Sequence, residues 1–182
     1  MEFDFWSTTI VFMIPGILWA AWIDYKEHRI PNWLNAFIGL LGFMAQGWFN
    51  GFEGVLAGLL GMSVGFGLLI VPWLMHAMGA GDVKLLMAIG IWFGPGLTLL
   101  SFCIGAVLGG LIALVMIIAT GRLWHAYINC SVIMQKVMNK GHLFSEFGST
   151  KSFGETSQLL PYGVPLTIGA LIVFFGQRLM LF

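Results

Sequence analysis

Long apolar segments separated by short polar ones make up most of this 182-residue chain. A helix that crosses a bilayer needs about 20 largely apolar residues. On that criterion the pattern predicts six spans, near residues 6–24, 33–50, 54–75, 83–95, 97–119 and 160–180. The fourth span is short, and we separate it from the fifth because the run Gly94-Pro95-Gly96 can break a helix. Since Pro and Gly also occur inside membrane helices, one long kinked helix is the competing interpretation.

The composition agrees with a membrane environment. The chain is 59% hydrophobic and only 9% charged, whereas a soluble domain carries about 25% charged residues. So few charged residues cannot cover the protein surface in water. We therefore expect a single all-α integral membrane domain over residues 1–182, with lipid as its solvent. The one extended polar region, residues 121–158, is predicted to lie in the cytoplasm. A formal net charge of zero argues against a nucleic-acid partner, because phosphate neutralisation requires a basic surplus.

The positive charges predict the orientation of the spans. Lys26 and Arg29 follow the first span, while the N-terminus has acidic residues and neither Lys nor Arg. The positive-inside rule therefore places the 25–32 loop in the cytoplasm and the N-terminus outside. Lys84 and the basic residues of the 121–158 segment should both be inside, which requires two crossings between them. Six spans satisfy this parity, both termini lie outside, and Arg178 remains as one positive charge near the outer end.

The third span is rich in glycine, and we expect these glycines to allow close helix packing where lipid provides no hydrophobic drive for association. Its run Gly61-Met62-Ser63-Val64-Gly65 matches the G-x-S-x-G nucleophile pattern. That pattern requires a strand–turn–helix context with His and Asp partners. A serine in the middle of a span has neither, so we do not interpret it as a nucleophile.

Two carboxylates at span ends carry the candidate chemistry, because ionisable residues at membrane depth are costly and usually functional. Asp24 closes the first span and Asp82 opens the fourth, both at the predicted cytoplasmic boundary. If those spans are neighbours, the carboxylates can share a site, where they cannot easily both ionise. Such a pair holds one proton and can act as general base and general acid together, without a metal or a cofactor. The structural alternatives are an interfacial ion pair for Asp24 and a helix N-cap for Asp82.

The neighbours of these aspartates have less certain roles. Gly79 and Gly81 give the backbone freedom next to Asp82. Lys84 is equally compatible with a bias on the ionisation of the pair and with a cytoplasmic anchor. Pro31 and Asn32 are typical of a helix start, which predicts that the second helix begins there.

Three motifs resemble those of type IV prepilin peptidases, in the same order along the chain. Residues 79–86, Gly-Ala-Gly-Asp-Val-Lys-Leu-Leu, look like the GxGD motif of that family. Residues 24–34, from Asp24 through Ile30-Pro31-Asn32, resemble the segment that carries the other catalytic aspartate. Residues 161–165, Pro-Tyr-Gly-Val-Pro, resemble the turn that opens the last helix. The resemblance implies an intramembrane aspartic endopeptidase with Asp24 and Asp82 as its dyad and Gly79, Gly81, Lys84, Pro161 and Gly163 in support.

The same resemblance implies the substrate and the branch of the family. Family members remove short basic leaders from prepilins or pseudopilins in the inner (plasma) membrane, cleaving after a glycine just before an apolar helix. The longer members carry a cytosolic domain with paired CxxC motifs, associated with N-methylation, and this chain has only Cys103 and Cys130. It therefore looks like the short CpaA/TadV-type branch that serves Tad/Flp pili.

Other functions remain open from the residues alone. A small transporter or a proton or cation relay could also use Asp24 and Asp82, although we see neither repeat symmetry nor midplane carboxylates. A non-catalytic membrane scaffold is a third possibility. An archaeal preflagellin peptidase, which shares the GxGD layout, is a nearer variant within the enzyme class.

Overall fold

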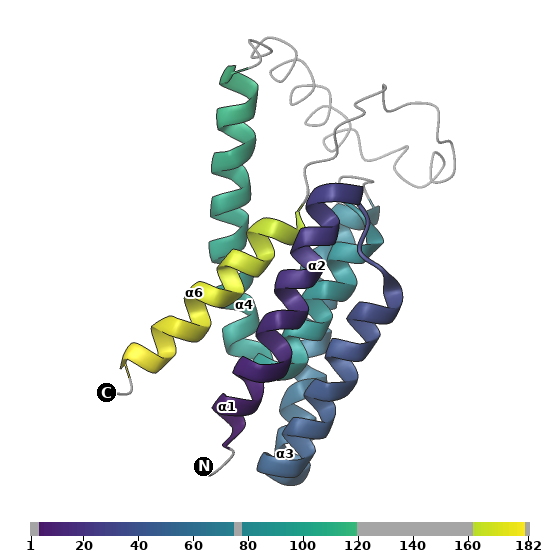
Figure 1. Ribbon diagram of the computed structural model, residues 1–182, viewed down its shortest axis with the longest axis vertical. Helices are drawn as coiled ribbons and strands as arrows, with labels where there is room; N and C mark the ends of the chain where they lie inside the picture. Colours follow the sequence, from purple (N-terminus) through teal and green to yellow (C-terminus); the bar gives the residue numbers. More distant parts are fainter. Residues whose placement is uncertain (1–3, 75–77, 120–161, 181–182) are drawn as a thin grey trace, which may run out of the picture. The chain divides into compact units, whose positions relative to one another are not determined.

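The structure is a computed structural model, which describes residues 4–74, 78–119 and 162–180. All secondary structure within these ranges is helical (Figure 1). The elements are α1 (Phe5–Thr8), the π-helix η1 (Thr9–Met13), α2 (Ile14–Glu27), α3 (Asn32–Leu74), α4 (Ala80–Ala119) and α6 (Gly163–Met180). Residues 1–109 and 160–182 form one compact unit, and the description below concerns this unit. The predicted segment at 121–158 lies outside the described residues.

Three helical stretches in the described residues are long and apolar enough to cross a membrane: Phe5–Glu27, Asn32–Leu74 and Ala80–Met116. The apolar stretch Gly163–Leu179 is shorter. The predicted start of the second helix is confirmed, because α3 begins at Asn32. The helix α4 begins at Ala80, three residues before the start predicted for the fourth span near residue 83.

The long helix α3 is a hairpin of two arms that reverses at Gly51, whose φ of 61° and ψ of −146° are not helical. We call residues 32–50 its first arm and residues 52–74 its second arm. A Cβ on Gly47 would contact Val55, and a Cβ on Gly58 would contact Phe43. Contacts that move apart along the chain in this way show that the two arms are antiparallel.

The long helix α4 also reverses, at Gly94 with φ 72° and ψ −179°, as Figure 1 shows. The break predicted at Gly94-Pro95-Gly96 is therefore confirmed. Pro95 has no N–H to offer the carbonyl of Ile91 one helical turn before it. The side-chain amide of Gln46, on the first arm of α3, donates instead to the carbonyls of Ile91 at 3.2 Å and Trp92 at 3.0 Å. Gln46 therefore provides a hydrogen-bond donor for these two buried carbonyls at the break.

The first arm of α4, residues 80–93, lies at the centre of the unit. Leu85, Leu86, Ile89 and Trp92 on this arm are each at most 1% exposed. They pack with buried side chains of η1, α2, α3 and α6 in two core clusters. The indole N–H of Trp92 also donates to the carbonyl of Ile38 at 2.9 Å. This arm therefore contacts the rest of the unit on nearly all sides, and its position determines where Asp82 lies.

The second arm of α3 packs against this central arm through glycine. A Cβ on Gly61 would overlap the carbonyl oxygen of Gly90, and a Cβ on Gly90 would overlap that of Gly61. A Cβ on Gly65 would lie 2.7 Å from the carbonyl oxygen of Leu86. The predicted close packing is confirmed for Gly61 and Gly65, whereas Gly67 has no atom within 4 Å of its Cβ position. Ser63, in the same stretch, donates its hydroxyl to the carbonyl of Leu59 in its own helix.

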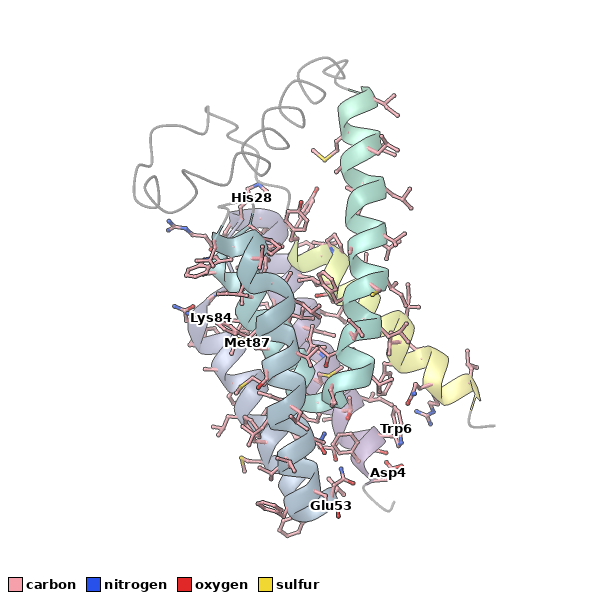
Figure 2. The ribbon with its side chains drawn as sticks, turned by 180° about the vertical axis from the view of Figure 1, so that it is seen from behind. Asp4, Trp6, His28, Glu53, Lys84 and Met87 are labelled. Carbon is pink, nitrogen blue, oxygen red and sulfur yellow. The ribbon has the colours of Figure 1, made fainter. Side chains whose placement is uncertain are left out.

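The charged residues gather at two ends of the unit (Figure 2). His28 and Lys84 lie toward one end, and Asp4 and Glu53 lie toward the other. The pKa of Asp4 is lowered, first by its hydrogen bonds with Ser7 and to a smaller extent by the Arg178 guanidinium. Arg178, the positive charge that did not fit the predicted orientation, therefore has an acidic neighbour at its own end.

We predict that Gly61→Ala lowers the free energy of unfolding by roughly 1–3 kcal/mol, the usual cost of overpacking a close contact. The added methyl group would displace the central arm of α4 from the backbone of α3. Thermal unfolding of the detergent-solubilised protein measures the effect. Gly67→Ala, on the same arm with no atom within 4 Å of its Cβ position, is the matched control. Equal midpoints for the two variants would contradict the close packing.

Candidate active site

Asp24 occupies the buried face of the first apolar helix. Met13, Ile17 and Ala20 form a stripe at helical spacing, each fully buried, and Asp24 continues that stripe one turn later. Its side chain is only 4% exposed. The helix ends three residues later, where His28 adopts a left-handed conformation (φ 50°) and donates its N–H to the Asp24 carbonyl at 2.9 Å. Asp24 therefore points into the protein close to a helix end.

Asp82 lies in the first turn of α4 and is 6% exposed. Because the helix begins at Ala80, Asp82 is its third residue, and the predicted alternative of an N-cap is wrong. Its Oδ2 accepts the backbone N–H of Gly79 at 3.3 Å, and its own N–H donates to the Gly79 carbonyl at 3.3 Å. Its other oxygen, Oδ1, is buried and has no hydrogen-bond partner among the described residues. One oxygen of this carboxylate thus accepts a hydrogen bond, and the other accepts none from the described residues.

Gly163, the first residue of α6, connects the two carboxylates. Its backbone N–H donates to Asp24 Oδ2 at 2.8 Å, across 139 positions of the chain. The same N–H also interacts with Asp82, and the Asp24 carboxylate acts electrostatically on Asp82. A backbone donor from a third helix is therefore hydrogen-bonded to Asp24 and lies close to Asp82.

Ile30 fills the space between these groups. A Cβ on Gly81 would lie 3.1 Å from the Cβ of Ile30, and a Cβ on Gly163 would lie 3.1 Å from its Cδ1. The same Cβ on Gly163 would lie 2.7 Å from Asp24 Oδ2. Only glycine allows such an approach of the backbone to a carboxylate. Ile30 therefore contacts both the start of α4 at Gly81 and the start of α6 at Gly163.

Two other predicted site residues, Lys84 and Pro161, are not among the described residues found in contact with the two aspartates. Lys84 is exposed, and its ammonium donates to Asn32 Oδ1 at 2.8 Å, which favours an anchoring role over a direct action on the aspartates. Pro161 lies outside the described residues. Within the described residues, no three His, Cys, Asp or Glu side chains gather where they could hold a metal ion.

The sequence analysis missed Ile30 and Asn35 as site residues. Asn35 is 4% exposed and its side-chain amide donates to the carbonyl of Gly81 at 3.0 Å. Asn35 carried a detectable signal, because a carboxamide in an apolar span is costly unless it has a partner. Ile30 lies within the motif at residues 24–34, but an isoleucine at a helix boundary is ordinary and does not by itself indicate a site residue.

The arrangement suits acid–base chemistry on a neutral group. Two carboxylates that share a buried site can hold one proton between them, which allows one to act as base and the other as acid. The N–H of Gly163 donates to Asp24 in this arrangement, and a hydrogen bond from a backbone N–H stabilises an ionised carboxylate.

Comparison with known proteins agrees with this arrangement. Residues 11–114 match the type IV leader peptidase family, and the matched range contains both aspartates and covers more than half of the chain. No significant match was found among curated proteins or among solved structures. The chain belongs to the type IV leader peptidase family, a family of aspartic prepilin leader peptidases that are membrane proteins.

We predict that Gly163→Ala lowers peptidase activity by about 100-fold, the usual effect of a misplaced catalytic group. The added Cβ would push the Gly163 N–H away from Asp24. The measurement is leader removal per mole of folded protein in detergent. Gly176→Ala, on the same helix with no atom within 4 Å of its Cβ position, should retain the activity of the wild type. Full activity in both variants would argue against a role for this donor.

Proposed function

We propose that Asp24 and Asp82 form the catalytic dyad of a peptidase that removes basic leaders from prepilins at the cytoplasmic boundary of the plasma membrane. The observation that carries the proposal is their convergence on the N–H of Gly163. Two costly buried carboxylates from α2 and α4 meet one donor from α6, although apolar side chains would serve a purely structural contact at lower cost.

The reaction follows from a dyad with one proton. The ionised carboxylate takes a proton from water, whose oxygen bonds to the carbonyl carbon of the scissile peptide. The protonated carboxyl gives its proton to the carbonyl oxygen, which produces a tetrahedral diol. The first carboxyl then protonates the leaving nitrogen and the C–N bond breaks, while a diol hydroxyl returns a proton to the second carboxylate. The dyad ends in its starting state.

The depth of the dyad suits a leader junction. Asp24 lies near the end of α2 and Asp82 near the start of α4, at the same end of the unit as His28 and Lys84 (Figure 2). We place this end in the cytoplasm, as the positive charges predict. A basic leader in the cytoplasm followed by an apolar helix in lipid would bring its junction to this level. The substrate must unwind there, because a helix hides its peptide bonds.

The six-span topology is part of this proposal. Each of the two long helices reverses at a glycine, so each provides two arms that could cross in opposite directions. At about 1.5 Å per residue, the first arm of α3 would extend roughly 28 Å and the first arm of α4 roughly 21 Å. The second of these is short for a bilayer core of about 30 Å. A short central arm would bring Asp82 below the headgroups while the longer helices span fully.

Within the family, we propose the short peptidase-only branch, with Flp-type prepilins as substrates. The support is the cysteine content, since two cysteines cannot form the paired CxxC motifs of the longer members. An archaeal preflagellin peptidase would also lack these motifs. A panel of both substrate types therefore distinguishes the two kinds of peptidase.

We predict that Asp24→Asn and Asp82→Asn each abolish leader removal, because an asparagine can neither take nor give the proton. Flp-type and preflagellin-type substrates are co-expressed with each variant, and intact mass reports cleavage at the glycine junction. Asp4→Asn, at the opposite end, should cleave as the wild type does. Cleavage by the Asp82→Asn variant would contradict the dyad. Failure of well-folded wild type on every substrate would direct attention to proton flux through the same carboxylates.

We predict that cysteines introduced at Glu27 and Glu53 are labelled from opposite sides of the membrane. After replacement of Cys103 and Cys130, a membrane-impermeant maleimide should reach position 53 in intact cells and position 27 only in inverted vesicles. The opposite result would place the dyad at the outer face.

A further inference from the structure

Both polar groups of the peptide that joins Gly81 to Asp82 are held by other parts of the protein. Its N–H donates to the Gly79 carbonyl at 3.3 Å. Its carbonyl accepts the side-chain amide of Asn35, on the first arm of α3, at 3.0 Å. The plane of this peptide sets the direction of the Asp82 Cα–Cβ bond. Asn35 therefore contacts the backbone element that aims the Asp82 side chain.

The backbone of Gly81, which accepts the hydrogen bond from Asn35, is closely packed against its neighbours. A Cβ on Gly81 would lie 3.1 Å from the Ile30 Cβ and 3.3 Å from its backbone nitrogen, so the Gly81 backbone rests on the segment that precedes α3. Asn35 belongs to the first turns of the same helix, and its N–H donates to the Pro31 carbonyl at 3.4 Å. The start of α3 thus supports Gly81 from one side through Ile30 and from another through Asn35.

Burial of the Asn35 carboxamide is also unfavourable if the residue has only a packing role. It is 4% exposed, and its Oδ1 is buried without a hydrogen-bond partner among the described residues. A buried carboxamide that satisfies only its donor side is destabilising. An apolar side chain would avoid this cost, so packing alone does not explain the carboxamide.

We propose that Asn35 is a positioning residue, which sets the orientation of Asp82 relative to Asp24 through the Gly81–Asp82 peptide. This inference rests on the proposed dyad and assigns Asn35 a role in the same reaction. Asn35 acts through the backbone and does not exchange protons. Its loss should therefore change the catalytic step more than substrate binding.

Gln46 provides a matched control on the same arm of α3. Its carboxamide is 5% exposed and donates to carbonyls of the same arm of α4, at Ile91 and Trp92. These carbonyls lie at the break in α4, away from the dyad. Gln46 and Asn35 thus share chemistry, burial and the helices they connect, and they differ in distance from the aspartates.

The test compares Asn35→Leu with Gln46→Leu, and Asn35→Asp with Gln46→Glu, in purified full-length protein with a prepilin that the wild type cleaves. Thermal midpoints, kcat, KM and the pH dependence of kcat are measured for each. Among the described residues, the charged group that acts electrostatically on Asp24 is His28, and Asp24 itself acts on Asp82. The limbs of the profile report the coupled carboxylates.

We expect Asn35→Leu to lower kcat by about 10- to 100-fold with KM changed less than about twofold, as expected for a misplaced catalytic group. The limbs of its pH profile should move, because the spacing of the two carboxylates changes. Gln46→Leu should lower the thermal midpoint but keep the pH profile and, per folded molecule, a kcat within about threefold. Asn35→Asp has nearly the same shape but adds a carboxylate near the dyad, so if the leucine variant does not insert, kcat and KM of this variant, and not its pH profile, are compared with those of Gln46→Glu.

Equal kcat and pH profiles for the Asn35 and Gln46 variants would overturn the inference, whether both are normal or both are equally impaired. In that case the wild type still cleaves and the proposed function stands. Absence of cleavage by folded wild type would instead remove the proposed function itself.

Discussion

Lipid offers no hydrogen bonds, so every polar atom at membrane depth must find its partner within the protein. The structure meets this constraint at the break in α4 and at one oxygen of each buried aspartate. Gln46 satisfies the carbonyls left free at the break in α4. Gly163 and Gly79 give backbone N–H groups to the two aspartates. The exceptions among the described residues are therefore informative, and two of the three, Asn35 Oδ1 and Asp82 Oδ1, belong to residues of the candidate site.

The first arm of α4, residues 80–93, connects these contacts to the candidate site. Glycine contacts press it against the second arm of α3, and Trp92 and Gln46 connect it to the first arm. Its start, where Asp82 lies, is held by Gly79 and Asn35. A short helix surrounded in this way cannot shift without breaking contacts on several sides. The position of Asp82 thus depends on packing that extends well beyond the two aspartates, and a catalytic role for the pair, as proposed, would require such precise positioning.

Much of this could be predicted from the sequence, because the decisive residues contrast with their surroundings. Asp24 and Asp82 are carboxylates at the ends of apolar segments, and Gly94-Pro95-Gly96 interrupts one. The start of α4 at Ala80 was missed because glycine and alanine give weak boundary signals. Asn35 and Gln46 could be seen as polar, but their partners lie 46 and 45 positions away. Such pairings depend on the register between helices, which a single sequence does not contain.

The contact between Gly163 and Asp24 has a consequence for biogenesis. The ribosome makes Asp24 long before it makes Gly163, 139 residues later, so the first helices enter the membrane without the donor that completes the pair. During that interval Asp24 lacks its backbone donor. On the proposed dyad, the site would therefore become complete only when α6 has inserted beside the first helices.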